Sequence, residues 1–554
     1  MGALFFLLKS SRGIVLVALV AGAVAGLSNT GLLALINATL SGSRPAASLI
    51  PAFVGLCLLM VVSRFVSNLL LVRLSNNAVY DLRVFLSRRI LSAPLRRLEE
   101  LGGHRLLATL TDDVPVIANA LSNIPLLCMN IVIVAGCLVY LGWLSWSVLL
   151  GVLGFMACGV VVYQLLMKRA LQYVTTSRQQ WDVLFKHLRA LVDGTKELKL
   201  HRMRREAFLA QSLETSAAAL RHHAVLSNSI YAAASSWGHV LIFILVGLLL
   251  FAAPTGGVGQ LHTTLGYVLV ILYMMSPMEF ILAVAPALGR ADVALKKIDE
   301  LGLRLQDDAE AVADFDLARA PAWGRLDVIG ITHAYYNEGE DDQFVLGPID
   351  LSFEPGELVF LVGGNGSGKT TLAKLLTGLY IPEGGEIRLG GQLITDENRE
   401  AYRQFFSVVF SDFFLFDSIL GLDTEGLDAK ARSYLRQLQL HHKVKIKDAE
   451  LSTTDLSQGQ RKRLALLTAY LEDRPFYLFD EWAADQDPVF KEVFYLQILP
   501  ELKARRKTVL VITHDDHYFS VADRIVKLDY GKLDAERALD AGHTLKNYLP
   551  HSRA

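Results

Sequence analysis

Cysteine is scarce in this chain of 554 residues, which contains only four. Cys57, Cys128, Cys137 and Cys158 lie within apolar runs, and the C-terminal half has none. Their positions show neither a pairing pattern nor the spacing of metal ligands, which argues against a disulfide framework or a cysteine metal site. We expect the four side chains to act as small buried hydrophobic groups.

Charged residues are also few, at 20% of the chain. The mean hydropathy of +0.36 is too high for an ordinary soluble enzyme, so part of the chain is expected to lie in a lipid bilayer. The net charge of -1 gives no overall indication of a nucleic-acid partner, and none is expected.

Long apolar runs account for the high hydropathy. The first follows Lys9 and Arg12 but is longer than a signal-peptide core and lacks a clear cleavage site, so we interpret it as a retained transmembrane helix. A helix needs roughly 20 apolar residues to cross a bilayer. The expected transmembrane helices span residues 13–36, 49–71, 124–143, 146–167, 231–253 and 265–288. Residues 1–290 are therefore predicted to form an all-α transmembrane domain of six helices.

The distribution of basic residues predicts the orientation of these helices. The connections at 40–48, 145 and 254–264 contain only Arg44, whereas the two long connections between them are rich in Arg and Lys. Because basic residues are retained on the cytoplasmic side, both termini are predicted to be cytoplasmic. The long connections have helical periodicity, so we expect the membrane helices to continue into the cytoplasm.

Two charges fall inside the predicted crossings, Arg64 in the second helix and Glu279 in the sixth. Intramembrane charges are costly and tend to be paired or to face a water-filled path. One hypothesis is that Arg64 and Glu279 form a pair or together line an inward-facing cavity. The alternative is that the helix ends are misplaced and each charge lies in cytoplasmic water.

Residues 291–325 turn charged and are interpreted as a linker, and residues 326–554 as an α/β domain. Residues 358–362, 476–479 and 508–512 are short apolar runs typical of buried parallel strands. The first of these strands precedes a glycine-rich phosphate-binding pattern. Its residues are Gly363, Gly364, Asn365, Gly366, Ser367, Gly368, Lys369, Thr370 and Thr371.

This pattern predicts a nucleotide site with named roles. Its backbone N–H groups would face the phosphates, Lys369 would reach the β- and γ-phosphates, and Thr370 would ligate Mg²⁺. Asp480 and Glu481 end the second apolar strand. Asp480 would hold Mg²⁺ through water, and Glu481 would polarise the attacking water. ATP and Mg²⁺ are the expected ligands.

Between these motifs stands Leu456-Ser457-Gln458-Gly459-Gln460. With the flanking motifs, it resembles the signature of ATP-binding cassette proteins. The resemblance implies that Ser457, Gly459 and Gln460 contact ATP held by a second copy of the chain. It further implies that Tyr335 stacks on adenine, that Asp487 belongs to the D-loop, and that His514 contacts the γ-phosphate.

The sequence departs from that family where most members place a glutamine. Ser411 occupies this position and is followed by Asp412. Serine is shorter, so Ser411, Asp412 or a water completes the Mg²⁺ shell, and the sequence leaves the choice open.

The runs 480–488 and 514–519, together with Gly363-Gly364-Asn365, resemble exporters of cyclic peptides and siderophore peptides in Gram-negative bacteria. These include exporters of lasso peptides, lipopeptide toxins and pyoverdine precursors. The resemblance implies a homodimeric, ATP-driven exporter in the bacterial inner membrane, with coupling helices near residues 102–113 and 202–208. The alternatives are a siderophore importer, a lipopeptide flippase, and an ATP-gated channel or regulator on the same fold.

Overall fold

The computed structural model describes residues 12–40, 45–251, 258–300, 322–335, 344–422 and 426–538. The chain divides into two compact units. The helical unit comprises Met1–Leu91 and Leu101–Asp308, and the α/β unit comprises Ser92–Glu100 and Ala309–Ala554. The α/β unit therefore includes a short segment of the N-terminal half of the chain.

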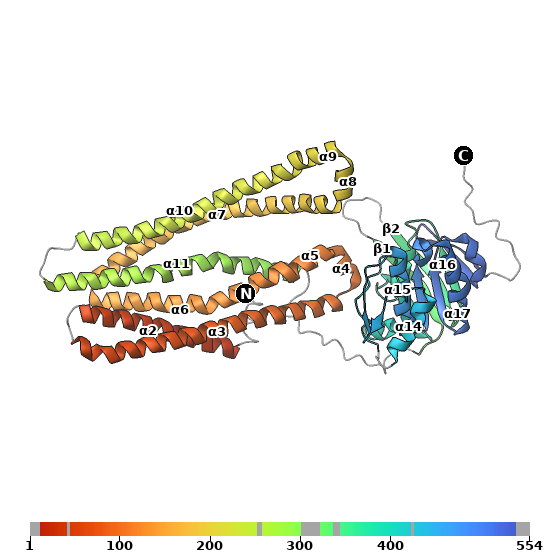
Figure 1. The fold of residues 1–554 in the computed structure, drawn as a ribbon, viewed down its shortest axis with the longest axis horizontal. Helices are drawn as coiled ribbons and strands as arrows, with labels where there is room; N and C mark the ends of the chain where they lie inside the picture. The colour runs from red at the N-terminus through yellow and green to blue at the C-terminus, as the bar shows by residue number, and fades with distance from the viewer. Residues whose placement is uncertain are drawn as a thin grey trace. The chain divides into compact units, whose positions relative to one another are not determined.

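Within the described residues, the helical unit contains six helices that are long and apolar enough to cross a membrane (Figure 1). Each overlaps one of the predicted crossings, which confirms the expected all-α transmembrane domain. Their bounds are α2 Arg12–Leu40, α3 Ala46–Ser92, α6 Val114–Leu144, α7 Trp146–Asp193, α10 Glu214–Phe251 and α11 Val258–Glu300. Shorter elements lie between them: α4 Leu95–Leu101, α5 Gly103–Ala108, η1 Thr109–Asp113, α8 Thr195–Leu200, α9 Arg202–Ala207 and η2 Phe208–Leu213.

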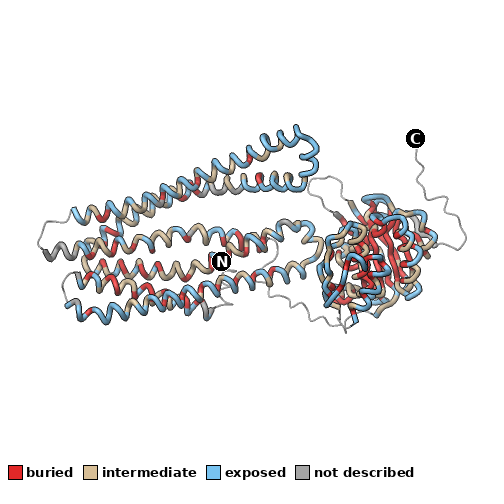
Figure 2. The backbone as a smooth tube through the Cα atoms, viewed as in Figure 1, coloured by how far each residue is buried: buried red, intermediate tan, exposed pale blue. Residues whose placement is uncertain are grey.

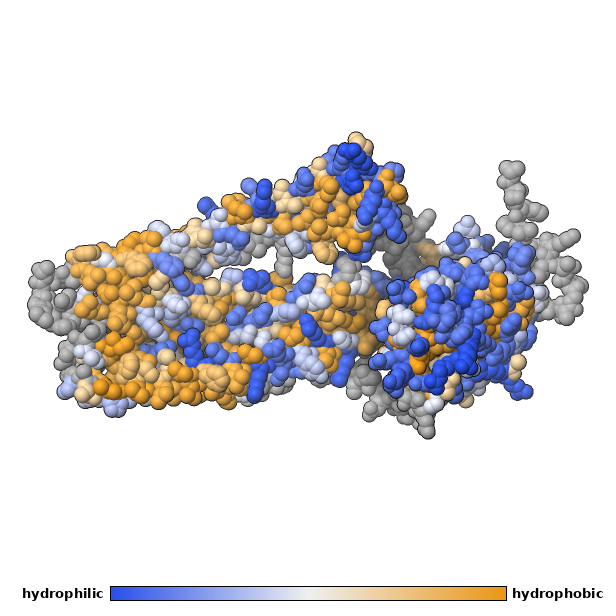
Figure 3. Space-filling model, viewed as in Figure 1, coloured by the Kyte–Doolittle hydropathy of each residue, from blue (hydrophilic) through white to orange (hydrophobic). Residues whose placement is uncertain are grey.

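The outward faces of these helices are apolar. Leu58, Phe65 and Val139 are each more than half exposed, and Figure 3 shows hydrophobic residues spread over the surface of the helical unit. Such a surface is stable where lipid replaces water, because helices satisfy their backbone hydrogen bonds internally. The prediction of four buried cysteines holds for Cys137 but is wrong for Cys158, which is exposed because it lies on an uncovered face of α7.

Two sheets carry most of the strands of the α/β unit. The first has the order β2-β1-β4-β5, and the second has the order β12-β11-β3-β10-β9-β6. The strands are β1 Leu326–Tyr335, β2 Phe344–Phe353, β3 Leu358–Val362, β4 Gly384–Leu389, β5 Gln392–Leu393, β6 Phe406–Val409, β7 Ile446–Lys447, β8 Glu450–Leu451, β9 Phe476–Asp480, β10 Thr508–Ile512, β11 Arg524–Asp529 and β12 Lys532–Ala538. Strands β11, β3, β10, β9 and β6 are parallel neighbours. This confirms the predicted α/β nucleotide-binding domain.

Helices cover the parallel strands, and the three central ones, β3, β10 and β9, are fully buried, as Figure 2 shows for the centre of this unit. Alternate residues of one strand point to opposite faces. Phe360 accordingly joins the core with Leu464, and its neighbour Leu361 joins the core with Leu372. The helices are α12 Lys369–Leu376, α13 Arg399–Arg403, α14 Leu427–Gln437, α15 Gln458–Glu472, η4 Trp482–Asp485, α16 Pro488–Val493, η5 Phe494–Ile498, α17 Leu499–Ala504 and η6 Asp516–Val521.

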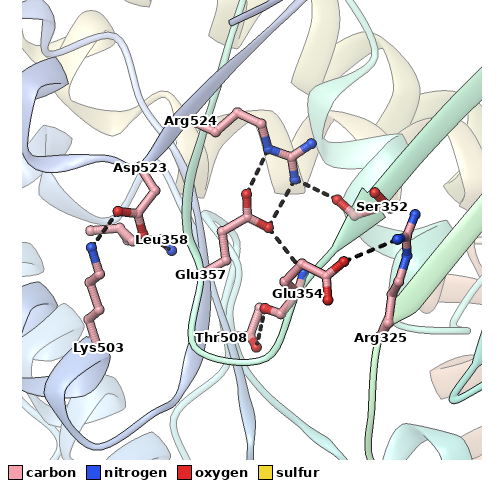
Figure 4. Close-up of polar contacts among 9 residues, drawn as sticks. All are labelled: Arg325, Ser352, Glu354, Glu357, Leu358, Lys503, Thr508, Asp523 and Arg524. Atoms are coloured by element: carbon pink, nitrogen blue, oxygen red, sulfur yellow. Dashed lines mark hydrogen bonds and ion pairs between the residues drawn. The ribbon is translucent and has the colours of Figure 1, made fainter. Parts of the chain in front are cut away.

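Polar contacts join the two sheets near the start of β3 (Figure 4). The Arg524 guanidinium donates to both carboxylate oxygens of Glu357, at 2.8 and 3.1 Å, and to the Ser352 carbonyl. Glu357 also accepts from the Glu354 N–H at 3.0 Å. Both charged groups are largely buried, and such two-point pairs fix geometry well. The network holds β3 in place, and the phosphate-binding loop follows this strand directly.

The helical unit extends further along the chain than predicted. Helix α11 continues past residue 290 to Glu300, into the segment interpreted as a linker. The rest of that segment lies mainly outside the described residues.

Candidate nucleotide-binding site

The predicted site residues follow the carboxyl ends of neighbouring parallel strands. The glycine-rich loop follows β3, Ser411 lies just beyond β6, Glu481 follows β9, and His514 lies just beyond β10. These four strands are adjacent in the sheet in the order β3-β10-β9-β6. The carboxyl edge of an open parallel sheet is the usual position of a ligand site in α/β folds.

The loop itself requires glycine at its first position. A Cβ on Gly363 would come within 2.1 Å of the Leu528 carbonyl oxygen, so no other residue fits without moving β11. The loop then runs directly into α12, whose first residues are Lys369 and Thr370. A helix N-terminus after a glycine-rich loop presents backbone N–H groups that favour a phosphate.

Lys369 is buried against this loop. Its ammonium group donates to the carbonyl oxygens of Gly363 and Gly364, at 3.0 and 2.9 Å. Burial lowers the pKa of Lys369, and the carboxylates of Glu481 and Asp480 act in the opposite direction. The two acceptors of the lysine ammonium are neutral carbonyl oxygens. Negatively charged phosphate oxygens would therefore be stronger partners for it.

Three oxygen-bearing side chains converge beside Lys369. The Thr370 hydroxyl donates to Oδ2 of Asp480 at 3.0 Å, and the Ser411 hydroxyl donates to the same oxygen at 3.3 Å. Asp480 is almost fully buried, and its Oδ1 makes no hydrogen bond. Burial raises the pKa of Asp480, and the hydrogen bond from Thr370 opposes the shift.

These three side-chain oxygens suit Mg²⁺, which prefers oxygen ligands and keeps several waters. The unpartnered Oδ1 of Asp480 gives the cation an acceptor that the protein leaves unused. Within the described ranges, no group of three or more His, Cys, Asp or Glu side chains could hold a metal. A cation here would therefore depend on one carboxylate, hydroxyl groups, water and phosphate oxygens.

Glu481 has the backbone expected of a functional position. Its φ of 49° lies in the left-handed region, which is uncommon for a residue other than glycine or asparagine. Its N–H donates to the Ile512 carbonyl at 3.0 Å, and this bond holds the conformation. The Glu481 carboxylate lies 3.3 Å from Nε2 of His514, and both side chains are partly exposed.

The signature residues form a second cluster at the start of α15. The Ser457 N–H donates to the Gln460 side chain at 3.3 Å. A Cβ on Gly459 would come within 2.8 Å of the Asp485 carbonyl oxygen, so the D-loop lies directly against the signature. Asp487 caps α16 by accepting from the Phe490 N–H at 2.9 Å, and this bond lowers the pKa of Asp487.

Sequence reasoning did not find the residue that joins the two clusters. Lys462, on α15, is buried and donates to the Glu481 carbonyl oxygen at 2.8 Å. It also forms an ion pair with Asp485 at 2.7 Å. Gln486 adds a hydrogen bond from its amide to the Gly459 carbonyl at 3.0 Å. The only signal in the sequence is the basic run 461–463, which also fits a solvated helix face.

A network behind His514 was not predicted either. The Tyr495 hydroxyl lies 2.6 Å from the Thr513 hydroxyl, and its ring stacks on Tyr518 at 4.2 Å. Lys491 pairs with Asp515 at 3.1 Å. These contacts fix the residues on both sides of His514.

The expected coupling segments and Tyr335 lie on elements other than those of the residues described above. The expected coupling helix at 102–113 begins after Ser92–Glu100, the segment that belongs to the α/β unit. In that segment, Glu99 accepts from the Lys374 ammonium at 2.7 Å and from the Tyr380 hydroxyl. The expected second coupling segment, 202–208, includes helix α9. Tyr335 is the last residue of β1.

The intramembrane charges are not paired as one hypothesis had them. Glu279 lies 3.1 Å from Nε2 of His239, on α10, rather than beside Arg64. Arg64 is exposed on α3.

Comparisons with known families match both units of the chain. The model of the ABC transporter transmembrane region matches residues 13–278. The model described as ABC transporter matches residues 346–484.

Individual proteins match over almost the whole chain. ATP-binding protein SyrD of Pseudomonas syringae pv. syringae is 37% identical over 524 residues, which cover 93% of this chain and 92% of that protein. An ATP-dependent lipid A-core flippase of Thiobacillus denitrificans is 28% identical over 507 residues, covering 86% and 84%. The solved structure of a bacterial Atm1-family ABC exporter with ATP bound has a TM-score of 0.73 at 17% identity, covering 96% and 95%.

Proposed function

Because this chain belongs to the ABC transporters, as a half-transporter of the exporter type, we propose that it exports a cyclic peptide or a peptide siderophore, or the precursor of one. The chain is a multi-pass membrane protein and an ATP-hydrolysing transporter. The proposal adds the cargo, the bacterial inner membrane and cytoplasmic termini. The convergence of Lys369, Thr370, Asp480, Glu481 and His514 in a chain with six candidate spans supports the ATP-driven part of the proposal. The cargo class rests on the likeness of residues 363–365, 480–488 and 514–519 to peptide exporters.

The geometry indicates how these residues would act on ATP. Lys369 and the loop N–H groups would hold the phosphates, and Mg²⁺, held by Thr370, Asp480 and Ser411, would neutralise part of their charge. Glu481 would orient the attacking water and accept its proton. His514, which faces the Glu481 carboxylate, would donate to a γ-phosphate oxygen and so hold the γ-phosphate close to Glu481.

The position of the signature supports a homodimer. Ser457, Gly459 and Gln460 lie at the start of α15, in contact with the D-loop of the same chain, and the hydrogen bonds around the loop of Lys369 do not involve them. A complete site would therefore combine the glycine-rich loop of one copy with the signature of the other. Each chain supplies one of each, so two copies would form two sites.

The segment Ser92–Glu100 supports coupling between hydrolysis and transport. Glu99 contacts Lys374, which lies on α12, the helix that begins with Lys369 and Thr370. Arg96 binds Glu383 at 2.7 Å and the Ala334 carbonyl at 3.1 Å. A shift of α12 on nucleotide binding would pass to this segment and from it to α3, which ends at Ser92.

The test is ATPase activity of the purified chain in lipid, wild type beside Glu481→Gln. Cyclic peptides and apo- or iron-loaded siderophores are added in turn, and accumulation is followed in inside-out vesicles. We expect one cargo class to stimulate hydrolysis and to accumulate, and the variant to abolish both effects. Equal inactivity of the two proteins with ATP bound would refute the pump and favour a regulator or channel. Cargo movement in the opposite direction would favour an importer.

A lipopeptide flippase is the second candidate, and one observation favours it. A relative that covers most of this chain is named as a flippase for a lipid. Stimulation by amphiphiles but not by cyclic peptides would select this candidate.

A further inference from the structure

The His514 side chain has few anchors of its own. It is 47% exposed, and its only polar contact among the described residues is the Glu481 carboxylate at 3.3 Å. The geometry of a functional site is maintained only where neighbouring residues fix the side chains that form it. The orientation of His514 therefore depends on what holds the loop that carries it.

A buried tyrosine on η5 holds this loop at several points. The Tyr495 hydroxyl donates to the Asp515 carboxylate at 3.1 Å and lies 2.6 Å from the Thr513 hydroxyl. Since a hydroxyl has one hydrogen, Thr513 is then the donor to Tyr495. The Tyr495 ring also stacks on Tyr518, with an angle of 11° between the ring planes. Tyr495 thus contacts the residues immediately before and after His514 and the residue four positions after it.

Lys491, on α16, adds a charged contact to the same loop. Its ammonium group lies 3.1 and 3.4 Å from the two oxygens of the Asp515 carboxylate. The two side chains are 24% and 28% exposed, and a pair so far withdrawn from water is screened less than a surface pair. Lys491 and Tyr495 are four residues apart in one helical segment, so they share a face, and both reach Asp515.

The segment that carries these two residues begins at the D-loop. Arg463, on α15, binds the Asp487 carboxylate that caps α16, and its guanidinium lies 3.7 Å from the centre of the Phe490 ring. It also donates from Nε to the Gln486 side chain at 2.9 Å. The start of α16 is therefore fixed to the helix that begins within the signature, and its later residues are fixed to the loop of His514.

A comparable pair elsewhere in the α/β unit shows why location matters. Lys503, on α17, donates to the Asp523 carboxylate, which also accepts from the Leu358 N–H at 3.0 Å (Figure 4). Leu358 begins β3, so this pair lies at the amino edge of the parallel sheet. The Lys491–Asp515 pair lies at the carboxyl edge, where the nucleotide site is expected.

We propose that Lys491 and Tyr495 are positioning residues for His514. They hold Asp515 and Thr513, the two neighbours of His514, so that its imidazole faces the place beside Glu481 where the γ-phosphate would lie. Neither residue needs to touch the nucleotide. Because both follow the D-loop on one segment, a shift of the D-loop would also turn His514. The inference rests on the γ-phosphate contact that the proposed function gives to His514, and it does not depend on the cargo.

The test compares ADP with the non-hydrolysable analogue AMP-PNP, because only the analogue carries a γ-phosphate. The full chain in lipid nanodiscs is titrated with each nucleotide in the presence of Mg²⁺ and without cargo. The variants are Lys491→Met, Lys491→Arg, Tyr495→Phe and His514→Ala. Lys503→Met is the matched control for loss of a paired ammonium group. Tyr470→Phe is the control for a buried hydroxyl, because that of Tyr470 makes no hydrogen bond within the described part of the chain.

We expect His514→Ala to weaken AMP-PNP binding roughly tenfold and to leave ADP binding unchanged. Lys491→Met should weaken AMP-PNP binding about fivefold and Tyr495→Phe about threefold, again without an effect on ADP. Lys491→Arg should bind as the wild type does, since it keeps the charge. Adding Lys491→Met to His514→Ala should change affinity by less than about twofold, because no imidazole is left to position.

The same further loss in the double variant as in Lys491→Met alone would overturn the proposal, since the lysine would then act independently of His514. Equal weakening of ADP and AMP-PNP would also overturn it, and so would binding in Lys491→Met and Tyr495→Phe that matches the two controls. Unchanged AMP-PNP binding in His514→Ala would refute the γ-phosphate contact and this inference with it. The assay involves neither cargo nor hydrolysis, so each of these failures is distinct from a failure of the export function.

Discussion

Replacing Lys462 with methionine tests whether this lysine positions the residue expected to activate water. Its side chain is only 3% exposed, and it contacts the Glu481 carbonyl and the Asp485 carboxylate. Methionine keeps the length and apolar stem of the side chain but removes its charge and its three donors. The change therefore affects the backbone of Glu481 without touching the Glu481 side chain.

The magnitude follows from the two contacts. A hydrogen bond from a charged group contributes about 1.5–3 kcal/mol, which applies to the bond to the Glu481 carbonyl. The pair with Asp485 contributes less, about 0.2–1 kcal/mol, because that carboxylate is 46% exposed. Glu481 has a positive φ that its neighbours must hold, so most of the loss should appear as misplacement of this residue. We expect kcat to fall roughly 10- to 100-fold.

The assay is ATP hydrolysis by the purified chain in lipid, with nucleotide affinity and thermal unfolding measured on the same samples. Lys462→Met should lower kcat and leave ATP affinity close to that of the wild type. Lys447→Gln, at an exposed position on β7, is the control for loss of a lysine charge. A kcat within twofold of the control would refute the positioning role, and a matching loss of ATP affinity would indicate general damage to the α/β unit.

Three further predictions concern other contacts of the α/β unit. Ser411→Ala should raise the Mg²⁺ concentration needed for half-maximal hydrolysis, because its hydroxyl binds the Asp480 carboxylate, whereas Asp412→Asn should not; equal effects would contradict this assignment. Glu99→Gln should leave basal ATP hydrolysis unchanged and reduce the stimulation of hydrolysis by cargo, because Glu99 contacts Lys374. Glu100→Gln is the comparison variant, and unchanged stimulation in Glu99→Gln would refute a coupling role. Burial, and to a smaller extent the charge of Arg96, lowers the pKa of His333 from its usual value of 6.5. As the pH falls below about 6.5, the histidine is protonated in the unfolded chain before it is protonated in the folded one, so stability should decrease. Thermal unfolding at about pH 7.5 and 5.5 should show this loss, and His333→Phe should reduce it; the same loss in the variant would assign it to other groups.

The sequence was sufficient to predict the elements whose pattern is local. The apolar runs predicted six helices, because the length needed to cross lipid can be counted along the chain. The short strands were predicted from β-rich apolar runs, and their carboxyl ends indicated where Asp480 and Glu481 would meet the glycine-rich loop. Parallel neighbours in the sheet then brought these residues together.

Contacts between distant segments could not be predicted in this way. The depth of Glu279 was apparent from its helix, but its partner depends on how α10 and α11 pack, which placed His239 rather than Arg64 beside it. Lys462 stands in a basic run that also fits a solvated helix face, and only the approach of the D-loop buries it. For Ser92–Glu100, membership of the α/β unit depends on contacts with residues far along the chain.

The bonds from Lys462 and Gln486 have a consequence for how two ATP sites would communicate. They connect helix α15, which begins within the signature, to the loop that follows β9 of the same chain. In the proposed homodimer, the signature of a chain serves one site and its Glu481 serves the other. A signature drawn toward ATP at one site would therefore pull on the water-activating residue of the opposite site. ATP binding at one site would thus change the position of Glu481 at the other site. The two sites would then hydrolyse ATP in a coupled sequence rather than independently.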